Sequence, residues 1–174
     1  AGRLYRFVLP DGSEVPDPAS RFQPQDAHGP SEVIDLATYR WKTDAWAGRP
    51  WEEMVIYEKH IGCFTPGGSF RTAIERLDHL QQLGVTALQI MPVGEFPGRY
   101  GWGYDGVLPY APDNSYGRPE DFMALVDAAH ARGISDSHGR LMVLITHNTD
   151  FGDAFEREGD DPRYFYTFSV EGYA

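Results

Sequence analysis

IMPVGEFPGRYGWGYDGVLPYAPDNSYGRPEDF, from Ile90 to Phe122, is the stretch of sequence that decides the fold. It ends a buried strand and then runs through aromatic residues, glycines and carboxylates before a helix begins. A loop this long inside a compact domain is uncommon unless it is functional. Its aromatic residues offer flat faces of the kind that stack on pyranose rings: Tyr100, Trp102, Tyr104, Tyr110 and Tyr116. The stretch therefore predicts a sugar-binding loop; the alternative is a set of rings that only fill the mouth of a barrel.

Size and charge narrow the class of protein. With 174 residues and 41% hydrophobic content, the chain has enough material for one ordinary domain with a core. Its net charge of -11 argues against nucleic acid or an anionic membrane as a partner, since both are bound by clustered Lys and Arg. A neutral glucan suits the chain better. Cys63 is the only cysteine, which excludes an internal disulfide.

The sequence predicts no cofactor, no metal and no membrane span. The histidines show no close pair at ligand spacing, and the acids between Asp150 and Asp161 lack the alternation with glycine of a calcium loop. GRYGWG is not followed by the Lys-Ser or Lys-Thr of a nucleotide site. No apolar run approaches the roughly 20 residues that cross a bilayer, and nothing at the N-terminus combines a basic start with an apolar core as a secretory signal would. A cytoplasmic location is the default expectation.

The pattern from Met54 onward alternates strand and helix, which predicts parallel strands with right-handed crossovers. Ser69 is a predicted N-cap, and apolar residues then recur at helical spacing until Gly84. Val85 to Val93 is an apolar strand of the kind buried on both faces. Pro119 starts a second helix, which Gly133 ends.

The first part of the chain has a different character. Leu4 to Leu9 is a predicted strand, closed by the turn Pro10-Asp11-Gly12, and it indicates the tail of a small β domain. Three tryptophans follow, which either stack on glucan or, as we expect, pin a linker onto its neighbour: Trp41, Trp46 and Trp51. The predicted division is therefore residues 1–38 for the β tail, 39–53 for the linker and 54–174 for the start of a barrel, atypical from residue 135.

Several separate sequence motifs resemble those of one protein family. VPDPASRF (Val15 to Phe22), HGPSEVID (His28 to Asp35), VIYEKHIGCF (Val55 to Phe64) and the deciding stretch occur in its order. The chain resembles the alpha-amylase superfamily of glycoside hydrolases as far as about residue 134, most closely the maltooligosyltrehalose trehalohydrolases. The resemblance implies an α/β fold, a partial (β/α)8 TIM-barrel of about three strands and two helices after the tail of a β-sandwich. A complete barrel takes about 250 residues, so the chain is expected to be a piece.

The resemblance also implies candidate site residues. Tyr104 in GWGYDG would stack on the sugar ring at the bond to be cut, beside Trp102, and Asp105 would order the site. An acid that only caps a turn is the alternative for Asp105. Glu95, near the end of the second strand, is given no catalytic role, because a carboxylate there is as often a loop anchor and the family does not use that position as its acid. His147 and Asn148 follow the predicted strand Leu141 to Thr146 in reversed order and are candidates for holding sugar; a polar turn is the alternative.

Hydrolysis with retention needs two carboxyl groups about 5 Å apart, which this family takes from its fourth and fifth strands. The chain ends near the third, so we expect no catalytic residue in it and no activity from it alone. The parent would release trehalose from maltooligosyl trehalose, with maltooligosaccharide as the partner. A branching or debranching enzyme and a non-catalytic carbohydrate-binding module are the alternatives. Open barrel edges would favour self-association.

Overall fold

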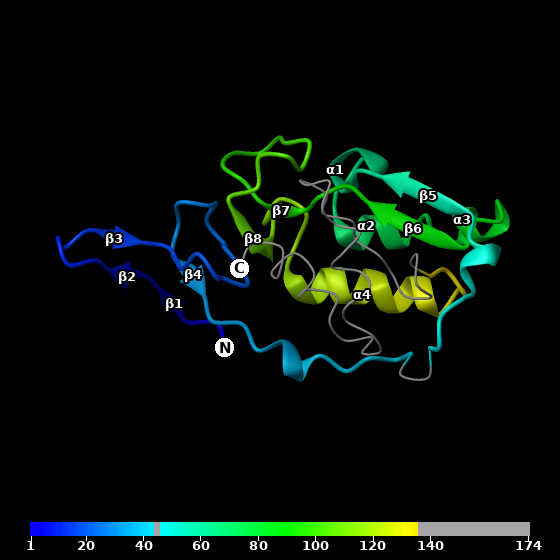
Figure 1. Ribbon diagram of the computed structural model, residues 1–174, viewed down its shortest axis with the longest axis horizontal. Helices are drawn as coiled ribbons and strands as arrows, with labels where there is room; N and C mark the ends of the chain where they lie inside the picture. The colour runs from blue at the N-terminus through cyan, green and yellow to red at the C-terminus, as the bar shows by residue number, and fades with distance from the viewer. Residues whose placement is uncertain (44–45, 136–174) are drawn as a thin grey trace.

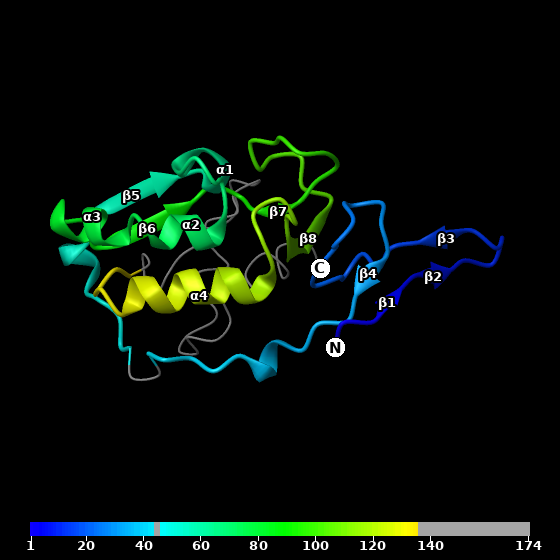
Figure 2. The same cartoon turned by 180° about the vertical axis from the view of Figure 1, so that it is seen from behind.

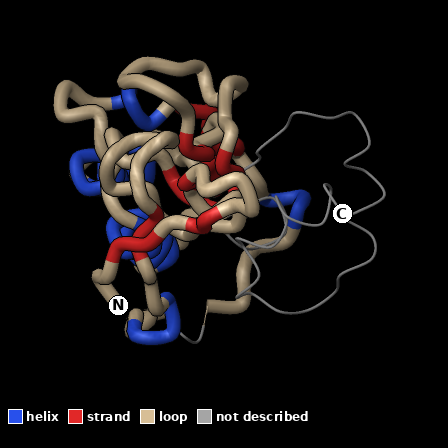
Figure 3. The backbone as a smooth tube through the Cα atoms, turned by 90° about the vertical axis from the view of Figure 1, so that its left-hand side faces the viewer, coloured by secondary structure: helices blue, strands red, loops and turns tan. Residues whose placement is uncertain are grey.

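The structure is a computed structural model that describes residues 1–43 and 46–135. Short strands and helices are joined by long loops, as the tan segments of Figure 3 show. The strands are β1 (Leu4–Tyr5), β2 (Phe7–Val8), β3 (Glu14–Val15), β4 (Ser31–Glu32), β5 (Ile56–Lys59), β6 (Ala87–Ile90), β7 (Gly94–Glu95) and β8 (Leu108–Pro112). The α-helices are α1 (Ile61–Phe64), α2 (Phe70–Ile74), α3 (Leu77–Gln82) and α4 (Pro119–His130). Among the described helices, none combines the length and apolar content needed to span a bilayer.

Strands β5 and β6 form the predicted parallel pair. Their register runs from Ile56 opposite Ala87 to Lys59 opposite Ile90. Ser135 continues the pattern through a parallel bridge to Ala87 on the other side of β6. Within the stretch VIYEKHIGCF, strand β5 ends at Lys59, because the backbone turns at His60 into the short helix α1.

The first crossover is helical but not continuous. Ser69 is the predicted N-cap of α2, and its hydroxyl accepts the backbone N–H of Thr72 at 3.2 Å. The single helix expected between Ser69 and Gly84 is wrong in one place, because the N–H groups of Glu75 and Arg76 donate to carbonyls three residues back. This tighter 3-10 bonding separates α2 from α3. Both helices still bury their apolar side chains in the same core.

Helix α4 starts at Pro119, as predicted, and lies beside α2 (Figures 1 and 2). The rings of Phe70 and Phe122 stack across the two helices with centroids 4.7 Å apart. The core is made of apolar side chains from α2, α3, α4 and β6, with Ile134 after α4: Phe70, Leu77, Leu80, Leu88, Ile90, Phe122, Leu125 and Ile134. Burial of these side chains, at roughly 25 cal/mol per Å² of apolar surface, is the main force that holds the helices on the strand pair.

The N-terminal segment forms a projecting antiparallel arm, seen at one end of the molecule in Figures 1 and 2. The strand expected from Leu4 to Leu9 is split, because β1 pairs with β4 and β2 pairs with β3. The predicted turn is present: the N–H of Gly12 donates to the carbonyl of Leu9 at 2.9 Å.

The segment that was expected to be a linker, residues 39–53, is attached to α4 through one buried carboxylate. Asp127 accepts hydrogen bonds from the Tyr39 hydroxyl at 2.9 Å, the Thr43 hydroxyl at 2.8 Å and the Lys42 backbone N–H at 3.1 Å. Trp41 packs against the core, and Trp46 stacks on His130 with ring centroids 5.0 Å apart. For these two tryptophans the pinning role is confirmed.

Replacing Asp127 with Ala should lower the free energy of unfolding by about 2 kcal/mol, because three donors lose an ionised acceptor that is shielded from water. Urea denaturation of the full chain measures the loss. Asp78→Ala is the matched control, since this helical Asp forms an exposed ion pair with Arg132 and should cost less than about 1 kcal/mol. Equal losses in the two variants would contradict the pinning role.

Candidate functional site

The candidate site is the loop between β7 and β8. The long loop expected before the helix at Pro119 contains strand β8, which pairs with β7 in antiparallel fashion. What remains of the loop, residues 96–107, lies toward the end of the molecule to which β5 and β6 point, near α1 (Figure 1). The carboxyl ends of the parallel strands and the aromatic loop therefore occupy the same side, where barrels of this kind carry their sites.

The five aromatic residues of the deciding stretch fall into two groups. Tyr100, Trp102 and Tyr104 are 88%, 69% and 52% exposed. Tyr116 is only 4% exposed and belongs to the core, while Tyr110 lies under the guanidinium of Arg21. The first three rings are thus exposed, whereas Tyr116 is one of the rings that fill the interior.

His60 fixes the middle of the loop. Its Nε2 lies 2.8 Å from the carbonyl oxygen of Gly101, to which it donates, and 3.3 Å from the Tyr116 hydroxyl. The edge of the His60 ring also faces the ring of Trp102, with centroids 6.3 Å apart. His60 is therefore a packed structural histidine whose contacts include Gly101 and Trp102 of the aromatic loop.

Close backbone packing fixes the next turn of the loop. Gly103 has a φ of +91°, and a Cβ placed there would lie 2.3 Å from the carbonyl oxygen of Pro92. No side chain fits that space. A glycine is therefore required between the exposed residues Trp102 and Tyr104, both for its φ and for its contact with Pro92, in the segment that follows β6.

Two buried carboxyl groups support the base of the loop. Glu95 accepts the backbone N–H of Asn114 at 2.9 Å and its side-chain amide at 3.1 Å. Asp113 accepts the backbone N–H of Ser115 at 2.9 Å. Burial, assisted by the neighbouring Asp113, raises the pKa of Glu95 to about 8. Glu95 thus holds the backbone that follows β8, and it has no exposed surface with which to meet a ligand.

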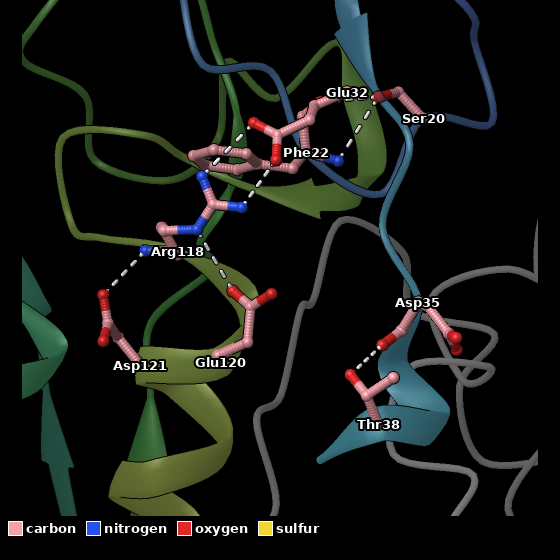
Figure 4. A network of polar contacts seen from close by, with 8 residues as sticks. All are labelled: Ser20, Phe22, Glu32, Asp35, Thr38, Arg118, Glu120 and Asp121. Carbon is pink, nitrogen blue, oxygen red and sulfur yellow. Dashed lines mark hydrogen bonds and ion pairs between the residues drawn. The ribbon is translucent and has the colours of Figure 1, made fainter. Parts of the chain in front are cut away.

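Sequence reasoning missed the contacts that reach the loop from the N-terminal segment. The carboxylate of Asp26 accepts the backbone N–H of Gly98 at 2.9 Å. Figure 4 shows the guanidinium of Arg118 against Glu32, to which it donates at 2.7 and 3.2 Å, and against the ring of Phe22. These pairs are separated by more than 70 residues, and nothing in the local sequence of either partner signals them.

The predicted site residues are only partly brought together. Trp102, Tyr104 and Asp105 are neighbours on the exposed face of the loop. His147 and Asn148, with the strand expected before them, lie outside the described residues. Among described residues the acids nearest the loop base are Glu95 and Asp113, and both are fully buried.

Comparison with known proteins places the chain in a family. Residues 18–164 match the family described as Alpha amylase, catalytic domain. The chain belongs to the alpha-amylase family. It is similar to the malto-oligosyltrehalose trehalohydrolase of Deinococcus radiodurans, at 53% identity over 76% of this chain and 22% of that protein. The enzyme of the same name from Saccharolobus solfataricus is 49% identical over 77% of this chain and 24% of its own length.

Solved structures of the alpha-amylase family show the same fold. A Salmonella typhimurium protein described as an alpha amylase superposes with a TM-score of 0.78 at 48% identity, covering 92% of this chain and 25% of that one. The pullulanase SAP of GBS in complex with maltotetraose has a TM-score of 0.57 at 25% identity, with 76% and 23% covered. The chain thus spans about a quarter of the length of the relatives it matches. In its described residues the alpha-amylase fold is a mixed α/β arrangement whose barrel is not closed.

Gly103→Ala should displace the loop, because the new methyl group would overlap the Pro92 carbonyl. Gly12→Ala, on the N-terminal arm, is the matched control: its φ is +85°, but no heavy atom lies within 4 Å of the added Cβ. Both variants should lose about 1 kcal/mol of stability to the unfavourable φ. Only Gly103→Ala should also move the indole NMR signal of Trp102, and an unmoved signal would contradict the packing described.

Glu95→Gln should flatten the dependence of stability on pH. The folded chain keeps Glu95 protonated up to about pH 8, while the ordinary value is 4.5, so its contribution to the free energy of unfolding is full below pH 4.5 and is lost as pH rises to 8. Urea titrations between pH 4.5 and 8.5 measure the slope. Glu58→Gln, at an exposed carboxylate bonded to Gln89, is the control and should keep the wild-type slope. A wild-type slope in Glu95→Gln would overturn this assignment.

Proposed function

We propose that the chain forms part of the catalytic barrel of an α-glucan hydrolase that releases trehalose from maltooligosyl trehalose. The identities of 53% and 49% to malto-oligosyltrehalose trehalohydrolases support this substrate class. The parallel pair β5 and β6, with a third parallel contact at Ser135, supports a (β/α)8 barrel. By this proposal residues 1–38 are the tail of a preceding β-sandwich, and residues 39–53 are the linker.

The observation that carries the proposal is the display of aromatic rings at the carboxyl end of the strands. Exposed apolar rings are unfavourable in water unless a ligand covers them, and the faces of pyranose rings are suitable ligands. Trp102 and Tyr104 would stack on successive faces of a maltooligosaccharide. Asp105, exposed beside Tyr104, would accept hydrogen bonds from sugar hydroxyl groups.

The same geometry supports the proposal that this chain alone does not hydrolyse glucans. Retention needs a nucleophile and a proton donor on opposite sides of the glycosidic bond, about 5 Å apart. Glu95 and Asp113 are close together, but both are fully buried and hold loop N–H groups. In this proposal the catalytic pair comes from strands that follow the third.

A branching enzyme is the second candidate, because the 1,4-alpha-glucan branching enzyme GlgB of Corynebacterium jeikeium is 35% identical over 77% of this chain. Both enzymes would use the aromatic loop, so binding does not separate them. The reaction products distinguish the two enzymes. By this proposal, a longer chain that includes the fourth and fifth strands should release trehalose from maltooligosyl trehalose and form no α-1,6 branches.

Maltotetraose added to the purified chain should change its tryptophan fluorescence in a saturable way, without release of glucose or trehalose. Trp102→Ala should weaken binding by about ten-fold or more, since it removes the largest stacking face. Phe7→Ala, at a half-exposed ring on the N-terminal arm, is the control and should bind as the wild type does. Absence of saturable binding would count against the sugar site, and turnover by the pure chain would refute the inactivity.

A further inference from the structure

Asp26 has an unusual backbone conformation. Its φ is +74°, and within residues 1–43 and 46–135 it is the only residue other than glycine with a positive φ. L-residues with a side chain rarely adopt this left-handed region, although Asp tolerates it better than most. A glycine would hold the same turn without that cost, so the side chain of Asp26 is expected to provide a compensating interaction.

The compensating interaction is with the aromatic loop. One carboxylate oxygen, Oδ2, accepts the N–H of Gly98, and the other, Oδ1, accepts the N–H of Ala27 at 2.5 Å. The carbonyl of Asp26 accepts the N–H of Gly29 at 2.8 Å, which closes the turn. The left-handed turn thus aims one ionised group at the point where the loop leaves Phe96 and Pro97.

The turn that carries Asp26 is itself held firmly. The buried side-chain amide of Gln23 donates to the carbonyls of Ala27 and Gly29 at 3.3 and 3.2 Å. Beyond the turn, Glu32 is clamped by the guanidinium of Arg118 in a two-bond contact, the geometry shown in Figure 4. Because the turn is fixed, the carboxylate of Asp26 restrains the backbone of Gly98. A carboxylate on a mobile loop would move together with Gly98 and would not restrain it.

We propose that Asp26 is a positioning residue that holds the loop of Trp102 and Tyr104 in the conformation that stacks on sugar. This inference rests on the proposed function of the loop. Asp26 acts through the Gly98 backbone and would not touch the sugar. Its contact is with one end of the loop, His60 holds the middle through Gly101, and β8 holds the other end.

The effect of the Asp26 charge on neighbouring acids provides a second, independent test of its position beside the loop. It lies near the buried acids Glu95 and Asp113 and contributes to the upward shift of both their pKa values. A substitution that removes this charge should lower the pKa of Glu95. A role of Asp26 limited to shaping its own turn would leave the Gly98 amide and the loop unaffected.

Amide hydrogen exchange tests the contact without any ligand. In Asp26→Gly, which keeps the positive φ at lower cost, the Gly98 amide should exchange about ten-fold faster while the melting temperature stays equal or rises. Asp26→Asn, which keeps one acceptor oxygen, should give an intermediate rate. Asp11→Gly is the matched control: this exposed turn Asp bonds Ser13 on the N-terminal arm, and its loss should leave Gly98 unchanged. Wild-type exchange at Gly98 in Asp26→Gly would overturn the proposal.

Maltotetraose titration then tests the link to sugar. Asp26→Gly should raise the Kd about three- to ten-fold, because a mobile loop must be ordered on binding, and Asp26→Asn should recover part of the loss. An unchanged Kd together with faster Gly98 exchange would refute the positioning role while leaving the sugar site intact. If the wild type binds no maltotetraose, the proposed function fails instead, and the exchange data still decide whether Asp26 restrains the loop.

Discussion

Parallel pairing of β5 with β6 is the constraint from which the rest of the described architecture follows. Two parallel neighbours in sequence need a crossover, and α2 with α3 supplies it by packing its apolar face on the strands. Because both strands run the same way, their carboxyl ends and the segments that follow them, α1 and the aromatic loop, meet on one side. Helix α4 adds the second covering element and brings Ser135 to the open side of β6.

The loop on that side is exposed at its rings and restrained at its backbone. Three contacts of different kinds do the restraining: an ionised carboxylate at Gly98, an imidazole at Gly101, and close packing of Gly103 on Pro92. A surface that stacks on a ligand requires exposed rings on an ordered backbone. When the backbone is already ordered, less conformational entropy is lost on binding.

Local sequence patterns predicted the helices and strands well, but they did not predict the contacts between residues far apart in the chain. The N-cap at Ser69 and the helix start at Pro119 each follow from residues within one or two turns of each other. The break between α2 and α3 depends on a tighter turn that apolar spacing does not reveal. The partners Asp26 and Gly98 lie 72 residues apart, and the burial of Tyr116 beside three exposed aromatic residues depends on a core formed by other segments. Neither the contact between Asp26 and Gly98 nor the burial of Tyr116 could be predicted from the sequence, and both became visible only in the structure.

Cys63 gives the molecule a practical property. It is the only cysteine in the chain, it is exposed on α1, and it follows His60 by one helical turn. Because His60 holds the backbone of Gly101, a spin label or dye attached to this thiol would sit close to the loop. The signal of such a label would report changes in the conformation of the loop. No other cysteine would have to be replaced first, because Cys63 is the only one.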